Sequence, residues 1–189
     1  RDDSILMLDT ETANDIDCPF CYDVSARIVN KEGKALAEKA YVIRDIFNDM
    51  RDVVKQAYYA EKIPQYINDL QHKERIMCNF MTCRYHLLGL MEQYNCDTVC
   101  AYNCYFDRNA LNNTLRYITK SRIRWFFPYK TQFICIWNMA CQTICQTEDY
   151  KMFAECNNLI SNNGKNYRAT AEAVYAYLTN DPSFQEEHK

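Results

Sequence analysis

A short apolar run near the start of the chain leads into two acidic residues, and this feature constrains the fold most strongly. Ile5-Leu6-Met7-Leu8 is followed by Asp9 and Glu11 in the segment SILMLDTETAN. A continuous apolar run of this length is typical of a strand that is buried on both faces. Residues i and i+2 of a strand point to the same side, so both carboxylates would face one point. Because buried charges need a partner, we expect a divalent cation there.

Length and composition limit the class of protein. The 189 residues fit one domain that buries roughly two thirds of its unfolded surface. The formal charge of -3 gives no overall attraction to nucleic acid, so such binding would need a local basic patch. Eleven Cys in a chain of this length favour free thiols in a reduced, cytoplasmic protein. No apolar run reaches the length of about 18 residues that would indicate a membrane span.

The residue pattern predicts an α/β order of elements. Residues 21–30 alternate apolar and polar side chains, the turn EGK follows at 32–34, and 35–44 indicate a returning strand, which makes an antiparallel meander. Helical spacing covers Ile46–Tyr59 and Phe80–Tyr94, on either side of Pro64. Further strands are expected at 97–103 and 132–137, and further helices at 105–118, 138–145, 170–178 and from Pro182 onward, capped by Asp181.

The segment CPFC at 18–21 raises two alternatives. A Cys-Pro-aromatic-Cys motif is redox-active where a helix lowers the pKa of the first thiol, but a strand pattern follows Cys21. Zinc would need a second pair, and Cys141 and Cys145 have the wrong spacing in a helical run. The pattern therefore favours ordinary loop cysteines.

A third carboxylate follows a second short strand. In AYNCYFDRNAL the apolar strand ends at Asn103, and Asp107 lies on the first turn of the next helix. An Asp-x-Glu pair by itself is common, but ligands gather at the ends of strands in open α/β sheets. The sequence therefore predicts that Asp9, Glu11 and Asp107 converge.

Three motifs together carry a family resemblance. LDTET, YNCYFD and the late EEH, spread from Asp9 to His188, resemble the motifs of the DEDD superfamily of 3′→5′ exonucleases, in the subgroup with His in its last motif. The layout is also similar to the proofreading-subunit-like exonucleases of bacteria and phages. The resemblance implies a ribonuclease-H-like mixed sheet, with three antiparallel strands first and parallel strands after them, flanked by helices. It implies a single exonuclease domain over residues 1–189.

The resemblance also assigns roles to residues. Asp9 would bridge two Mg²⁺ or Mn²⁺ ions, Glu11 would complete one of them, and Asp107 would hold the second, largely through water. His188 would be the general base, since the pKa of His lies near neutrality. The expected contacts to the terminal nucleotide are Thr12, Asn14, Asn103 and Phe106.

The end of the sequence departs from the family pattern. The last motif of the family carries an Asp a few residues after the His, and this sequence stops at Lys189. We therefore expect the native chain to continue past Lys189 with a helical segment that carries this Asp. The domain as given would then lack the C-terminal helix of the family.

The segment KSRIRWFFPYK at 120–130 interleaves cations with aromatic rings. Lys and Arg can follow phosphates and aromatic rings can stack on bases, so the segment is a candidate contact for nucleic acid. The competing interpretation is that Trp125 and Phe127 begin a core strand with a solvated, charged flank.

The favoured function is a metal-dependent exonuclease that releases nucleoside 5′-monophosphates from 3′ ends of single-stranded DNA or RNA. A non-catalytic alternative is a nuclease-like module that binds 3′ ends or a partner such as a DNA polymerase or another replication or repair protein. A further alternative is a phosphodiesterase acting on short oligonucleotides or dinucleotides. The same metal site would permit the phosphodiesterase activity.

Overall fold

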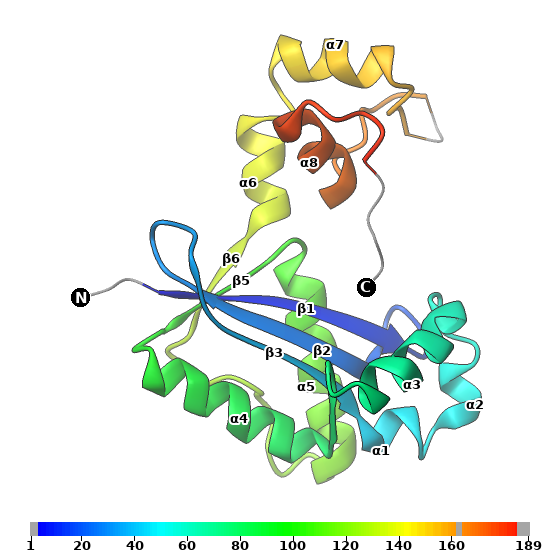
Figure 1. Ribbon diagram of the computed structural model, residues 1–189, viewed down its shortest axis with the longest axis vertical. Helices are drawn as coiled ribbons and strands as arrows, with labels where there is room; N and C mark the ends of the chain where they lie inside the picture. Colours follow the sequence, from blue (N-terminus) through cyan, green and yellow to red (C-terminus); the bar gives the residue numbers. More distant parts are fainter. Residues whose placement is uncertain (1–3, 162–163, 185–189) are drawn as a thin grey trace. The chain divides into compact units, whose positions relative to one another are not determined.

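The computed structural model describes residues 4–161 and 164–184 and divides into two compact units (Figure 1). The first is Arg1–Ile134 and the second is Cys135–Lys189. The acidic residues that the structure describes from the predicted site, Asp9, Glu11 and Asp107, belong to the first unit.

A six-stranded mixed sheet forms the centre of the first unit, in the order β4-β3-β2-β1-β5-β6. Strands β1, β2 and β3 pair antiparallel, while β5 runs parallel to β1 and β4 runs parallel to β3. The strand bounds are Ile5–Ala13 (β1), Phe20–Val29 (β2), Ala35–Ile43 (β3), Ile76–Cys78 (β4), Thr98–Ala101 (β5) and Gln132–Cys135 (β6). The predicted α/β class is confirmed, with three antiparallel strands first in a ribonuclease-H-like arrangement.

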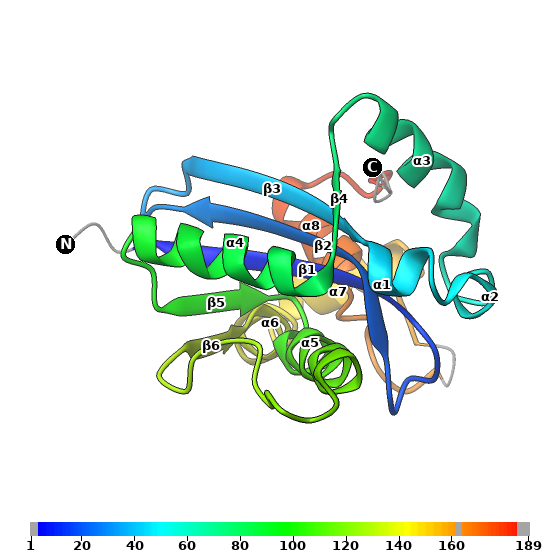
Figure 2. The ribbon, with the colours of Figure 1, turned by 90° about the horizontal axis from the view of Figure 1, so that it is seen from below.

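Two long helices cover one face of this sheet. Figure 2 shows α4 (Phe80–Gln93) and α5 (Cys104–Thr119) on the same side, where α4 packs on β2 and β3, and α5 packs on β1, β2 and β5. Alternate residues of β1 and β2 supply the buried side chains of this face, namely Leu6, Leu8, Val24, Ala26 and Ile28. Asn79 caps α4 by accepting a hydrogen bond from the Thr82 N–H at 2.8 Å.

The predicted helix over Ile46–Tyr59 is wrong, because the segment forms two short helices. These are α1 (Arg44–Phe47) and α2 (Arg51–Val54), followed by the 3-10 turn η1 (Ala60–Lys62) and α3 (Ile63–Gln71). Asn48 and Asp49 separate α1 from α2, and such side chains compete with the backbone for hydrogen bonds inside a helix. Strand β4 was not predicted, since three residues carry no readable alternation.

The second unit is helical. It contains α6 (Ile136–Thr143), α7 (Glu148–Cys156) and α8 (Ala171–Thr179), of which α7 and α8 are capped by Thr147 and Thr170. Its small core consists of the buried residues Ala140, Tyr150, Ala154 and Val174. Pro182 and Ser183 form a turn that Asp181 caps through the Ser183 N–H, and the rest of the predicted last helix lies outside the described residues.

Among residues 4–161 and 164–184, none of the helices is long and apolar enough to cross a membrane.

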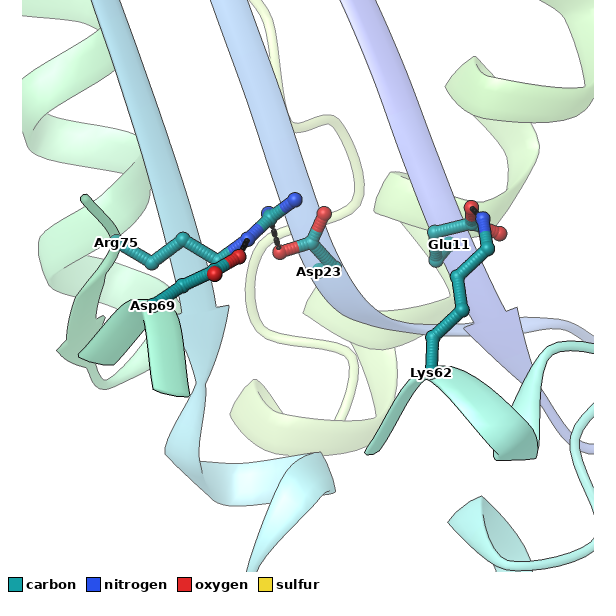
Figure 3. A network of polar contacts seen from close by, with 5 residues as sticks. All are labelled: Glu11, Asp23, Lys62, Asp69 and Arg75. Carbon is teal, nitrogen blue, oxygen red and sulfur yellow. Dashed lines mark hydrogen bonds and ion pairs between the residues drawn. The ribbon is translucent and has the colours of Figure 1, made fainter. Parts of the chain in front are cut away.

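A buried ion-pair network ties α3 and the start of β4 to the central sheet. Arg75 forms an ion pair with Asp23 of β2, and its Nε lies 3.0 Å from Oδ2 of Asp69 at the end of α3 (Figure 3). All three side chains are at most 9% exposed. Burial raises the pKa of Asp23, and the guanidinium of Arg75 opposes that rise. Two carboxylates therefore share one guanidinium under the protein surface.

We expect Arg75→Met to lower the free energy of unfolding by about 3–5 kcal/mol, because it leaves buried carboxylates without their cation. The matched control is Arg27→Met, which removes an exposed pair between Arg27 and Glu38 at 2.7 Å. The control should lower the free energy of unfolding by less than about 1 kcal/mol. Urea unfolding of both variants measures the difference, and equal costs would contradict a structural role for the Arg75 network.

Candidate functional site

Asp9 and Glu11 lie within β1 and not after its end. The strand continues to Ala13 because its antiparallel ladder with β2 continues, pairing Asp9 with Ser25 and Glu11 with Asp23. The parallel pairing with β5 is much shorter. Its last pair joins Met7 to Cys100, and β5 ends at Ala101.

The site is therefore a fork between two strands. β1 continues past Met7, while the chain leaves β5 and enters α5 at Cys104. Asp9 lies on β1 just beyond the last pair, and Asp107 lies on the first turn of α5. Ligand sites in open α/β sheets form where neighbouring strands lead away from each other in this way.

Asp107 is buried because of its place in the helix. The buried side of α5 includes Cys104, Asp107, Leu111 and Leu115, at helical spacings of three and four residues. The Thr10 hydroxyl donates a hydrogen bond to Asp107 Oδ1 at 2.8 Å. Burial raises the pKa of Asp107 to about 7; the Thr10 bond opposes this rise, and the negative charge of Asp9 adds to it.

The charge of Asp9 acts on the carboxyl of Asp107. Its side chain reaches solvent, yet the surrounding protein raises the pKa of its carboxyl by desolvation. Lys62 lowers that pKa most, followed by the Thr10 backbone N–H and by Arg75. The Thr10 N–H also lowers the pKa of Asp107. The negative charge of Asp9 thus reaches Asp107, whose carboxyl is bound by Thr10 on the α5 side of β1.

Glu11 is held by a lysine from the segment that follows β3. Lys62 Nζ lies 2.7 Å from Glu11 Oε1, and the two side chains are only 11% and 16% exposed (Figure 3). The same ammonium lies 3.9 Å from the centre of the Tyr59 ring, a cation–π contact. Lys62 is therefore fixed between an aromatic face and a carboxylate.

A β-bulge shapes the wall beside Glu11. Glu11 pairs with Asp23 and Thr12 pairs with Cys21, so Tyr22 is the extra residue on β2. The ring of Tyr22 packs edge-on against that of Tyr66, with centroids 5.7 Å apart. Burial raises the pKa of the Tyr22 hydroxyl, and the charge of Glu11 adds to this rise. The bulge thus places the aromatic ring of Tyr22 close enough to Glu11 for the carboxylate charge to act on its hydroxyl.

The predicted substrate residues occupy varied positions around the fork. Thr12 and Phe106 are half-buried, and Asn103 is exposed at the start of α5. Asn14 has a positive φ of 73°, and its Nδ2 donates to the carbonyl oxygen of Cys18 at 2.8 Å. That amide therefore stabilises the turn after β1. His188 lies outside the described residues.

The CPFC segment has the properties of structural cysteines. Cys18 is exposed, whereas Cys21 is buried in β2, and its N–H donates to Thr114 Oγ1 at 2.8 Å. Burial raises the pKa of the Cys21 thiol, the opposite of what a thiolate nucleophile needs. Across the described part of the chain, no three His, Cys, Asp or Glu side chains form a group that could hold a metal ion. The three acids expected to converge, Asp9, Glu11 and Asp107, are therefore not gathered into such a group here.

Comparison with known proteins adds no relative. No protein-family model matches the chain, and no curated protein is similar to it.

Several residues of the site escaped the sequence prediction. Thr10 lies inside the quoted motif, and its alternation with Asp9 and Glu11 could have indicated that it faces α5. Asp23 lies on the polar face expected for β2, without a signal that it is buried. Lys62 and Arg75 come from the segment between β3 and α4, and no motif marks them.

We expect Asp107→Asn to stabilise the metal-free protein at about pH 8. Burial raises the pKa of this carboxyl from 3.8 in the unfolded chain to about 7 in the folded protein, so wild-type stability falls as pH rises between these values. Asn keeps the oxygen that accepts from Thr10 and removes the buried charge, which should gain about 1–3 kcal/mol at pH 8.

Urea unfolding in EDTA at about pH 5 and pH 8 tests this expectation. The matched control is Asp149→Asn, an exposed Asp on the first turn of α7, which should leave the pH dependence unchanged. If the stability of the wild type and of Asp107→Asn depended on pH in the same way, the raised pKa of a buried Asp107 would be contradicted.

Proposed function

We propose that the protein is a metal-dependent 3′→5′ exonuclease of the DEDD type, which hydrolyses the terminal phosphodiester of single-stranded DNA or RNA and releases nucleoside 5′-monophosphates. The observation that carries the proposal is the pair Asp9 and Asp107 at the fork between β1 and β5. Burial raises the pKa of both carboxyls, and the charge of Asp9 adds to the rise at Asp107, so ionising both at this place costs free energy. A divalent cation would offset that cost.

The chemistry of these donors fits Mg²⁺ or Mn²⁺. Carboxylate oxygens are the hard ligands that these ions prefer. Asp9 and Asp107 would hold the metal, and Glu11, two residues from Asp9 on the same side of β1, would join them. Bound there, a pair of such ions would supply an activated water and neutralise charge on the scissile phosphate. Thr10 would keep Asp107 oriented through its 2.8 Å hydrogen bond.

The segment 120–130 supports a nucleic-acid substrate. Phe126 and Phe127 are buried, whereas Trp125 is 51% exposed and Tyr129 is 100% exposed. Phe127 is in the core as the second interpretation expected, but the expected core strand is wrong, because Trp125 is exposed and β6 starts only at Gln132. The exposed rings of Trp125 and Tyr129 are available to stack on bases. Arg122 and Arg124 are also exposed.

This segment returns along α5 toward the fork. The Phe126 N–H donates to Asn112 Oδ1 at 2.8 Å, which brings the chain back beside the middle of the helix. The guanidinium of Arg108 then lies 5.8 Å from the Trp125 ring centre and 4.8 Å from that of Phe133. Arg108 directly follows Asp107 in the sequence. A single strand bound at the fork would therefore find cations and exposed rings along α5.

A second candidate is a module that binds 3′ ends, or a polymerase partner, without cutting. The ion pair between Glu11 and Lys62 favours it, because one expected metal ligand is already neutralised. The two candidates differ in turnover and not in binding.

We expect Asp9→Asn and Asp107→Asn each to lower hydrolysis by orders of magnitude, because each removes a ligand charge from the metal site. Asp149→Asn is the matched control and should keep full activity. End-labelled single-stranded DNA, RNA and dinucleotides would be incubated with Mg²⁺, Mn²⁺ or EDTA, and the products resolved at nucleotide length.

The outcomes separate the candidates. Full activity in EDTA, or in Asp9→Asn, contradicts the proposed exonuclease. Hydrolysis of dinucleotides without any shortening of longer strands would identify a phosphodiesterase instead. Tight binding of 3′ ends with no hydrolysis in either metal would favour the binding module.

We expect Trp125→Ala to weaken binding of single-stranded DNA roughly 5- to 100-fold, since stacking of one base is worth about 1–3 kcal/mol. Fluorescence anisotropy in EDTA measures binding without cutting. Tyr85→Ala, which removes a different exposed ring, on α4, is the matched control and should not change the affinity.

Arg124→Ala should reduce the number of ions released on binding, measured from the salt dependence of the affinity, by about one. Unchanged affinity in both Trp125→Ala and Arg124→Ala would exclude this segment from the substrate path.

A further inference from the structure

We infer that Lys62 is a positioning residue for Glu11 and that it competes with the divalent metal ion for this carboxylate, so that it sets how tightly the acidic site binds metal. The inference rests on the metal site of the proposed function. It concerns the affinity of that site and not the chemical step.

The contacts of Lys62 hold its ammonium in a fixed position beside Glu11. Its ammonium lies 2.7 Å from Glu11 Oε1 and packs on the Tyr59 ring at 3.9 Å, with a side chain that is only 11% exposed. An ordinary surface lysine keeps its ammonium in water. Lys62 instead directs it into the acidic end of β1 (Figure 3).

The backbone around Lys62 fixes where the side chain begins. Lys62 ends η1, its N–H donates to the Tyr59 carbonyl oxygen at 3.0 Å, and α3 starts at the next residue with Pro64 in its first turn. Proline in the first turn restricts the backbone without the loss of a helical hydrogen bond. The ammonium therefore reaches Glu11 from an ordered junction.

Lys62 interacts electrostatically with more than one carboxylate near the fork. Arg75, the other cation that lowers the pKa of Asp9, is already bound by Asp23 and Asp69. Lys62 pairs with Glu11 and is also the strongest influence that lowers the pKa of Asp9. One ammonium thus balances part of the charge that Asp9, Glu11 and Asp107 bring to this end of the sheet.

A metal ion bound by Asp9 and Glu11 would meet this ammonium at close range. Like charges in a partly buried site repel strongly because little water screens them. The ion must displace Lys62 from Glu11 or bind against its charge, and either path weakens metal binding. Lys62 would also keep Glu11 ordered when no metal is bound.

Binding of Mn²⁺ alone, followed by electron paramagnetic resonance of the free ion in the 189-residue protein, tests the inference. We expect Lys62→Met to bind Mn²⁺ at least about tenfold more tightly than the wild type, because it removes the competing charge and keeps the apolar stem. Lys62→Arg keeps the charge and should match the wild type. Asp9→Asn should abolish the tight binding in the Lys62→Met protein, which assigns the Mn²⁺ to this site.

The matched control is Lys151→Met in α7, which removes an ion pair with Glu148 of 2.6 Å from the other unit. It should leave Mn²⁺ affinity unchanged. Thermal unfolding in EDTA reports whether each variant folds. If Lys62→Met does not fold, Lys62→Gln replaces it in the same titration with the same expectation.

Several results would overturn the inference. Unchanged or weaker Mn²⁺ binding in Lys62→Met would mean that Lys62 only stabilises the fold or helps to build the site, and absence of Mn²⁺ binding in both proteins would remove the site itself. The proposed function is tested separately. A protein that binds Mn²⁺ as expected but hydrolyses no nucleic acid contradicts the exonuclease alone, whereas metal-dependent hydrolysis with unchanged Mn²⁺ affinity contradicts this inference alone.

Discussion

The hydrogen bond between Thr10 and Asp107 joins the two elements on which the candidate site depends. It links the central strand β1 to the first turn of α5 at 2.8 Å, at the place where β1 and β5 separate. A second bond fastens the same helix to β2, since Thr114 Oγ1 accepts from the Cys21 N–H at 2.8 Å. With both bonds in place, the buried carboxylate of Asp107 is held where the charge of Asp9 reaches it. The position of α5 therefore decides the geometry of the fork.

Burying acids at this end of the sheet carries a cost in stability, which the fold offsets in two ways. Arg75 pairs with both Asp23 and Asp69 inside the protein, and Lys62 pairs with Glu11 close to the surface. Among the described residues, hydrogen bonds from the Thr10 hydroxyl and from backbone N–H groups oppose the burial of Asp107, and its pKa is still raised to about 7. Natural proteins commonly accept such strain where charged groups must meet a ligand.

The segment between β3 and α4 connects these elements and also supplies two cations to the acidic end of the sheet. Its short helices α1 and α2 pack near the ends of β1, β2 and β3, and its later part supplies both Lys62 and Arg75. We expect the removal of each cation to affect a different property, namely stability for Arg75 and metal affinity for Lys62. The segment after α5 has a comparable division, with Phe126 and Phe127 in the core and Trp125 exposed.

The sequence by itself determined the elements whose signal is local. Alternation of side chains predicted the β1–β2–β3 meander, and helical spacing predicted α4 and α5, because each pattern reflects burial against one neighbouring layer. It also predicted that Asp9 and Asp107 lie at the ends of neighbouring strands. Asp107 does follow the end of β5, but Asp9 lies within β1, which continues to Ala13. Only the tertiary structure decided that Asp107 is buried against Thr10, that Tyr22 is a bulge, and that Glu11 meets Lys62. These contacts join residues far apart in the chain, and their energies depend on burial and charge, which the order of residues does not reveal.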